Sequence, residues 1–225
     1  TTNGADYSED MVQYRYFASP AISHVIPSSG PTEGGTVVSV YGRNFVDSDT
    51  LYCRFGNSTS VLGRWISGDR IECTTPSMVA GDIVISMTNN GVDYTTTNST
   101  FMVLPESEVS KVSPTFGPVG TSTAVTVQGT GFVFSRSLYC RFGLSAVAAM
   151  YVNETTVVCT APDIPAGVVN VTVSSNGVDY SSSKATYEYV AAHHIQSILP
   201  RSGSVSGSTL VSITGTDFKN TSGLF

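Results

Sequence analysis

Apolar and polar residues alternate in two similar stretches of the chain, residues 36–41 and 123–128, where β-branched side chains take every second position. A period of two predicts β-strands that turn one face toward a core. Each stretch runs into a glycine that is followed three residues later by an aromatic side chain, Gly42 with Phe45 and Gly129 with Phe132. No part of the chain keeps a helical period over three turns, so we expect little or no helix.

Two longer strands are predicted at residues 81–90 and 167–176, each running into an Asn-Gly pair. Asn-Gly favours a type I′ hairpin turn, in which both central residues take positive φ. The segments that begin at Val92 and Val178 are therefore expected to return as the last strand of each unit. Together the patterns predict roughly seven strands in two packed sheets per unit.

The chain contains an internal repeat. Residues 51–56, Leu-Tyr-Cys-Arg-Phe-Gly, recur as residues 138–143, and residues 90–94, Asn-Gly-Val-Asp-Tyr, recur as residues 176–180. The offset is 87 residues for the first motif and 86 for the second. Since two distant motifs keep nearly one spacing, the chain holds a tandem duplication of a unit about 86 residues long, which is the size of a small β-sandwich domain.

The same template extends to both ends of the chain. Residues 3–7 repeat the Asn-Gly motif one period earlier, and the sequence after Pro200 repeats the sequence after Pro114. We therefore expect four parts: residues 1–18 as the C-terminal strand of a preceding domain, 19–105 and 106–191 as complete domains, and 192–225 as the N-terminal part of a following domain.

The repeated residues resemble the IPT/TIG domains, immunoglobulin-like modules of plexins, related receptors and some transcription factors. In the first copy the resemblance rests on Pro27, Gly30-Pro31, Gly34-Gly35-Thr36, Gly42 with Phe45, Cys53-Arg54-Phe55-Gly56, Ile71, Cys73, Pro76 and Asn90-Gly91. In the second it rests on Pro114, Gly117-Pro118, Thr123, Gly129 with Phe132, Cys140-Arg141-Phe142-Gly143, Val158-Cys159, Pro162 and Asn176-Gly177. Thr121-Ser122 replaces Gly34-Gly35 and marks one loop as different. The resemblance implies an all-β fold of tandem immunoglobulin-like sandwiches arranged as a rod, with a partial domain at each end.

The four cysteines fall two to a unit, Cys53 with Cys73 and Cys140 with Cys159. Pairing within each unit is the simplest of the three possible connectivities, and buried free thiols are the alternative. The family resemblance implies that the two positions lie on neighbouring strands and are bonded. The sequence contains no Cys-x-x-Cys motif and no Cys/His cluster of the kind that holds zinc.

Five Asn-x-Ser/Thr sequons are candidate N-glycosylation sites: Asn57, Asn98, Asn153, Asn170 and Asn220. They are not copies of one ancestral site, and alternation places Asn170 outward between inward Val169 and Val171. In a eukaryotic host we expect N-linked glycans at most of them. Sequons and paired cysteines together predict an extracellular or cell-surface, secreted chain.

Charge and hydropathy exclude several classes of partner. The formal net charge is −6 and the pI about 4.9, without a cluster of Lys or Arg, so nucleic acid is not an expected partner. No apolar run approaches the ~18 residues that span a bilayer, so we expect no membrane insertion within this chain.

Candidate catalytic and metal-binding residues are few. His24 and the pair His193-His194 occupy similar places beside Val25 and Ile195, which favours packing at domain junctions over catalysis. Residues 47–49, Asp-Ser-Asp, lack the spaced carboxylates of a calcium loop. Asp93 and Asp179 follow Asn-Gly pairs and are interpreted as turn residues. We predict no enzyme activity and no cofactor apart from the covalent glycans.

The junctions at residues 105–108 and 191–194 are short, which predicts limited swinging between domains. The leading hypothesis is a non-enzymatic extracellular structural or adhesive repeat protein, glycosylated and able to assemble into a filament or surface layer. Its expected partners are proteins, above all copies of itself or neighbouring repeats, with glycan contacts in addition. The alternative is the stalk of a plexin-like receptor. A weaker alternative is a carbohydrate-binding module, which would need Trp65 in an exposed aromatic platform. We interpret Trp65 instead as a core side chain.

Overall fold

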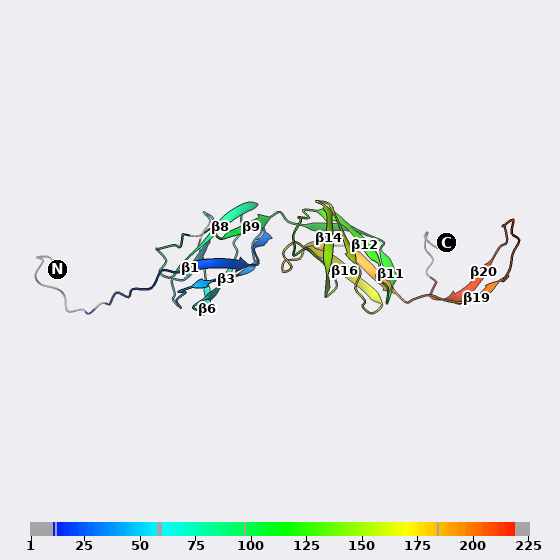
Figure 1. Cartoon of the computed structure of the whole chain (residues 1–225), viewed down its shortest axis with the longest axis horizontal. Coiled ribbons are helices and arrows are strands. Elements are labelled where there is room, and N and C mark those ends of the chain that lie inside the picture. The colour runs from blue at the N-terminus through cyan, green and yellow to red at the C-terminus, as the bar shows by residue number, and fades with distance from the viewer. Residues whose placement is uncertain (1–10, 12, 58–59, 97, 184, 219–225) are drawn as a thin grey trace, which may run out of the picture. The chain divides into compact units, whose positions relative to one another are not determined.

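The computed structural model describes residues 11, 13–57, 60–96, 98–183 and 185–218. This part of the chain contains strands and turns and no helix, and it builds one β-sandwich from β1 to β9 and a second from β10 to β18 (Figure 1). We call these the first and second repeats. The prediction of tandem all-β sandwiches is confirmed.

The first repeat has two sheets. One has the strand order β1-β3-β7-β6 and the other β2-β9-β8-β4-β5. Their strands are β1 (Ala21–Ile26), β2 (Ser29–Pro31), β3 (Val37–Arg43), β4 (Tyr52–Phe55), β5 (Val61–Leu62), β6 (Arg64–Ser67), β7 (Arg70–Thr74), β8 (Gly81–Thr88) and β9 (Thr100–Leu104). Alternate residues face inward, so that Val38, Val40, Ile71, Ile85 and Phe101 are fully buried between the sheets.

The second repeat has a similar succession of strands. They are β10 (Glu108–Ser113), β11 (Phe116–Pro118), β12 (Ala124–Thr130), β13 (Tyr139–Phe142), β14 (Ser145–Asn153), β15 (Thr156–Thr160), β16 (Gly167–Ser174), β17 (Ser182–Ser183) and β18 (Thr186–Val190). Its core contains Val125, Val127, Phe142, Val157 and Tyr187.

Two differences separate the repeats: β14 replaces β5 and β6, and β17 has no counterpart among the described strands of the first repeat. In the second repeat β14 is continuous and pairs first with β13 and then with β15, so all nine strands form one hydrogen-bonded series. In the first repeat the corresponding segment is divided at Gly63 into β5 and β6. Gly63 and Ala149 are equivalent, because their amides donate to the carbonyls of Leu51 and Leu138 in the two repeats. A glycine inside a strand weakens it, in agreement with the break at Gly63.

A third copy of the fold begins after the second repeat. β19 (His194–Leu199) pairs with β20 (Ser212–Thr216) in the antiparallel register that β1 shares with β3 and β10 with β12, and each pair has a bulge near its start. At the other end, residues 1–10 and 12, on which the predicted terminal strand largely depends, lie outside the described residues. Residues 13–20 form no strand. The exact domain limits given above stay a proposal.

The Asn-Gly turns are not of type I′, contrary to prediction. Gly91 and Gly177 have positive φ, but Asn90 and Asn176 do not. Instead the side-chain oxygen of Asn90 accepts hydrogen bonds from the backbone amides of Val92 and Asp93, at 3.0 and 2.9 Å. These side-chain hydrogen bonds therefore stabilise the turn without the positive φ at Asn90 that a type I′ turn requires. The chain also does not return at once, because β9 begins only at Thr100.

Candidate functional site

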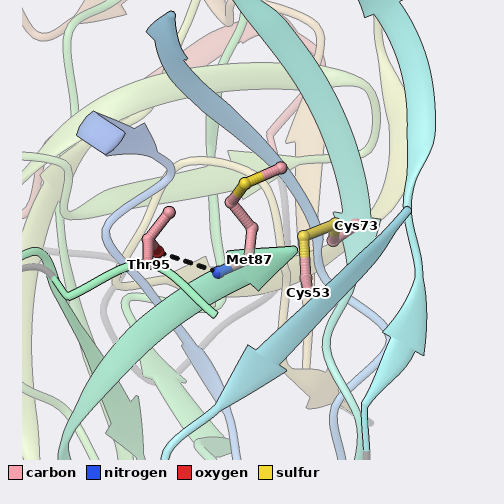
Figure 2. The surroundings of a disulfide bond; sticks show 4 residues. All are labelled: Cys53, Cys73, Met87 and Thr95. Atoms are coloured by element: carbon pink, nitrogen blue, oxygen red, sulfur yellow. Dashed lines mark hydrogen bonds between the residues drawn. A yellow bond between two sulfur atoms is a disulfide. The ribbon is translucent and has the colours of Figure 1, made fainter. Parts of the chain in front are cut away.

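Each repeat contains one disulfide, between two strands that do not pair with each other. Cys53 on β4 is bonded to Cys73 on β7, with 6.3 Å between their Cα atoms, and both side chains are buried. Figure 2 shows this bond together with Met87, which is the register partner of Cys53 on β8. The bonded strands belong to different sheets, so the expectation that they are neighbours is wrong. The same holds for Cys140 on β13 and Cys159 on β15, because β14 lies between these strands.

A hydroxyl holds the segment after each Asn-Gly turn against the strand before it. The backbone amide of Met87 donates to Oγ1 of Thr95 at 3.1 Å, and Thr95 donates its own amide to the Met87 carbonyl (Figure 2). Ser181 makes the same two hydrogen bonds to Val173 in the second repeat. This exchange takes the place of regular strand pairing where β9 has not yet begun.

An arginine lies over a tyrosine on the outer surface of each repeat. The guanidinium carbon of Arg54 is 3.9 Å from the ring centre of Tyr94, and Arg141 lies 3.9 Å from the ring centre of Tyr180. Arg54 points outward, because its neighbours Cys53 and Phe55 face the core. Cation–π contacts of this kind fix the segment after the turn to the sheet below it.

The repeated aspartates hold the turns, as interpreted from the sequence. The side-chain amide of Asn90 donates to Asp93 at 2.8 Å, and that of Asn176 donates to Asp179 at 2.7 Å. His24 stacks on Tyr41, with 4.7 Å between ring centres, and its Nδ1 lies 3.1 Å from the hydroxyl of Ser23. Within the described residues, no group of three His, Cys, Asp or Glu side chains is placed to hold a metal ion.

Trp65 is not a core residue. Its side chain is 38% exposed, and its indole nitrogen donates to the carbonyl of Phe45 at 3.3 Å. The structure therefore corrects the interpretation of Trp65 as buried.

The first repeat carries a charged cluster that sequence analysis missed. Glu72 on β7 accepts hydrogen bonds from Arg64 and from Arg70, the latter at 2.6 Å, and the hydrogen bond from Arg64 is the main cause that lowers the pKa of Glu72. Arg70 also lies 5.7 Å from the ring centre of Tyr41. The second repeat has Met150, Thr156 and Val158 in place of the three charged residues. The alternation around buried Ile71 places Arg70 and Glu72 on the same outer side and is a sequence signal for this cluster.

Four of the five candidate glycosylation sites are exposed in the structure: Asn57, Asn98, Asn153 and Asn170. Asn220 lies outside the described residues. The side-chain oxygen of Asn153 accepts hydrogen bonds from the amide and the hydroxyl of Thr155. Asn170 points away from the core between Val169 and Val171, as the alternation predicts, and whether any of these residues carries a sugar stays a prediction.

The comparison with protein families agrees with this architecture. A model of the IPT/TIG domain matches residues 20–103, 107–189 and 194–224. The chain belongs to the IPT/TIG domain family. The third match begins at the strand pair β19–β20, where the structure shows the start of another copy.

Proteins with similar IPT/TIG segments include fibrocystin-L and plexins. The chain is 27% identical to fibrocystin-L of Mus musculus over 207 residues, covering 89% of this chain and 5% of that protein. It is 25% identical to plexin-A3 of Rattus norvegicus over 214 residues, covering 88% of this chain and 11% of that protein. The chain thus spans about a tenth or less of the length of these relatives.

Among solved structures, the extracellular region of plexin A4 has the same fold, with a TM-score of 0.54 at 20% identity, covering 84% of this chain and 18% of that one. Disulfides persist in oxidising compartments, and both complete IPT/TIG repeats contain one. The chain is therefore extracellular or exposed at the cell surface. In the described residues, no helix has the length and apolar character needed to cross a membrane.

Proposed function

We propose that these IPT/TIG repeats are a non-enzymatic spacer in the ectodomain of a cell-surface protein, comparable to the IPT/TIG segments of plexins and fibrocystin-L. The observation that carries the proposal is that the two repeats share the contacts that stabilise each domain but differ in part of their outer surface. They share the buried disulfide, the arginine over the tyrosine and the hydrogen-bonded Asn-Gly turn. All three features stabilise a single domain.

Another part of the outer surface, in contrast, differs from repeat to repeat. The cluster of Arg64, Arg70 and Glu72 belongs to the first repeat, and Met150, which replaces Arg64, is 61% exposed in the second. A segment that only keeps two parts of a protein at a fixed distance needs every repeat to be stably folded, whereas most of its surface residues are free to vary. Partners then bind at individual repeats or elsewhere in the longer protein, and they are expected to be proteins.

An adhesive or filament-forming protein is the second candidate, because the sheet edges of the two repeats differ. β10 of the second repeat pairs on its outer side with β17, through Glu108 with Ser182 and Val109 with Ser183. In the described part of the first repeat β1 is the end strand of its sheet. An unpaired edge can accept a strand from another chain.

Electron microscopy of the full-length ectodomain separates these two functions. A spacer predicts separate particles, which lose the length of one domain when residues 106–191 are deleted. Antibody staining of intact cells that express the full-length protein should label this segment at the surface. Ordered filaments of native protein, abolished by a Pro substitution in β1, would instead support the structural polymer and overturn the spacer.

A further inference from the structure

Two sequons that lie at different positions in the sequence of the repeat occupy the same place in the fold of the two repeats. The amide of Gly56 donates to the carbonyl of Val84 at 2.7 Å, and the amide of its counterpart Gly143 donates to the carbonyl of Asn170 at 2.9 Å. Val84 and Asn170 are therefore equivalent. Asn57 directly follows Gly56, so Asn57 and Asn170 mark the same corner of the same sheet in the two repeats.

A third sequon lies beside that corner. The amide of Ile85 donates to the carbonyl of Ser99 at 3.0 Å, which brings the segment before β9 against β8. Along this segment Asn98, Thr100 and Met102 are exposed, whereas Phe101 is fully buried. Since side chains alternate between the faces of a strand, Asn98 points outward on the side of Thr100 and Met102.

These positions define one surface, the outer side of β4, β8 and β9 in the first repeat and of β13, β16 and β18 in the second. We call it the sequon face. Asn153 is not on it, because Asn153 pairs with Thr156 in the hairpin of β14 and β15. The outer side of β3 and β7 in the first repeat, which we call the opposite face, carries Tyr41, Arg70 and Glu72. His24 on β1 lies at the boundary between the two faces, because it lines one cavity together with Asn98. No described sequon lies on the opposite face.

We infer that N-linked glycans at Asn57, Asn98 and Asn170 cover the sequon face of both repeats and leave the opposite face of the first repeat uncovered. In the modification, Nδ2 of each asparagine bonds to the anomeric carbon of an oligosaccharide. The bond from that carbon to a lipid pyrophosphate donor breaks, the pyrophosphate leaves, and the amide nitrogen loses one proton to a base. All three asparagines are exposed in the folded domain, so the attached sugars do not disturb the core.

Two tyrosines of the first repeat provide matched probes of the two faces. Tyr94 lies under Arg54 on the sequon face, and Tyr41 lies against His24 and Arg70 on the opposite face. Both side chains are partly buried and both contact an arginine. Met102, which is 44% exposed, is a more reactive probe on the sequon face.

The experiment uses the full chain secreted from mammalian cells. Enzymatic removal of N-glycans in heavy-oxygen water followed by peptide mass spectrometry gives the occupancy of each asparagine. Hydroxyl-radical footprinting before and after glycan removal should show a severalfold rise in oxidation of Met102 and Tyr94 and no change at Tyr41. Unoccupied Asn57, Asn98 and Asn170, or an equal rise on both faces, would overturn the inference.

Single-site variants identify the sugar that shields Met102. Asn98→Gln and Thr100→Ala abolish the same sequon by different changes, and both should expose Met102 before glycan removal. Asn153→Gln is the matched control and should leave Met102 shielded. If Asn98→Gln lowers secretion, Thr100→Ala still provides the measurement. Shielding of Met102 that survives the loss of this sequon would contradict a role for the glycan at Asn98.

Discussion

The phenyl ring of Phe132 lies directly over Gly129, so closely that a Cβ atom on residue 129 would be 2.7 Å from the Cζ atom of the ring. The same Cβ would be 1.9 Å from the carbonyl oxygen of Glu108 on the adjacent strand. Gly42 with Phe45 and Gly215 with Phe218 show this arrangement in the other two copies. The glycine is required because the ring and the neighbouring strand fill the space above it.

Replacing Gly129 with alanine should therefore unfold the second repeat or cost at least about 3 kcal/mol of its free energy of unfolding, since a backbone carbonyl has little room to move. Scanning calorimetry of the full chain measures the loss. Gly120→Ala is the control, because residue 120 has positive φ but no atom within 4 Å of the added Cβ. It should cost only the ~1–2 kcal/mol of a left-handed backbone. Equal losses in the two variants would contradict the packing argument.

The strands and the tandem sandwiches were predictable because alternation, turn residues and the internal repeat all point to one fold. The spacing of Gly129 and Phe132 was visible in the sequence, but its cause was not, since the contact depends on the carbonyl of Glu108 from another strand. The Asn-Gly turns were predicted with the wrong geometry because the backbone preference of an Asn-Gly pair does not include the hydrogen bonds that the Asn90 side chain accepts. The common place of Asn57 and Asn170 follows only from the hydrogen-bond register.

The disulfide between Cys53 and Cys73 should stabilise the first repeat without affecting the second. It closes a loop with a sequence separation of 20 residues, so the paired variant Cys53→Ala/Cys73→Ala should lower the free energy of unfolding of the first repeat by about 3 kcal/mol. Trp65 is the only tryptophan of the chain, and its fluorescence reports on this repeat alone. The corresponding Cys140→Ala/Cys159→Ala variant should leave that transition in place. A shift of the Trp65 unfolding transition in this second variant would mean that the repeats do not unfold independently.

The contact between Arg141 and Tyr180 should contribute about 0.5–1 kcal/mol to the stability of the second repeat, as expected for a surface cation–π pair. A double-mutant cycle with Arg141→Gln and Tyr180→Leu measures this coupling in chemical unfolding. The second repeat is the better choice, because Tyr94 of the first repeat also has its hydroxyl 2.5 Å from that of Ser60. Additive losses in the double variant would show that the two side chains do not interact.

Tyr189 should make the second repeat less stable in alkaline solution. Burial, followed by the nearby Tyr187 and Asp163, raises the pKa of Tyr189 from 10.0 to about 12, and its hydroxyl makes no hydrogen bond within the described structure. Between these two values the unfolded chain releases the Tyr189 proton while the folded domain keeps it. Stability is therefore retained below pH 10 and falls as the pH rises toward 12.

Tyr189→Phe removes the ionisable group and should make the second repeat less sensitive to pH above 10. At neutral pH the variant should be as stable as the wild type, because the buried hydroxyl has no protein partner to lose. Urea unfolding in short incubations from pH 8 upward, compared between the two proteins, gives the contribution of this one side chain. Parallel pH profiles for wild type and variant would mean that Tyr189 does not cause the alkaline loss, because the other tyrosines are present in both proteins.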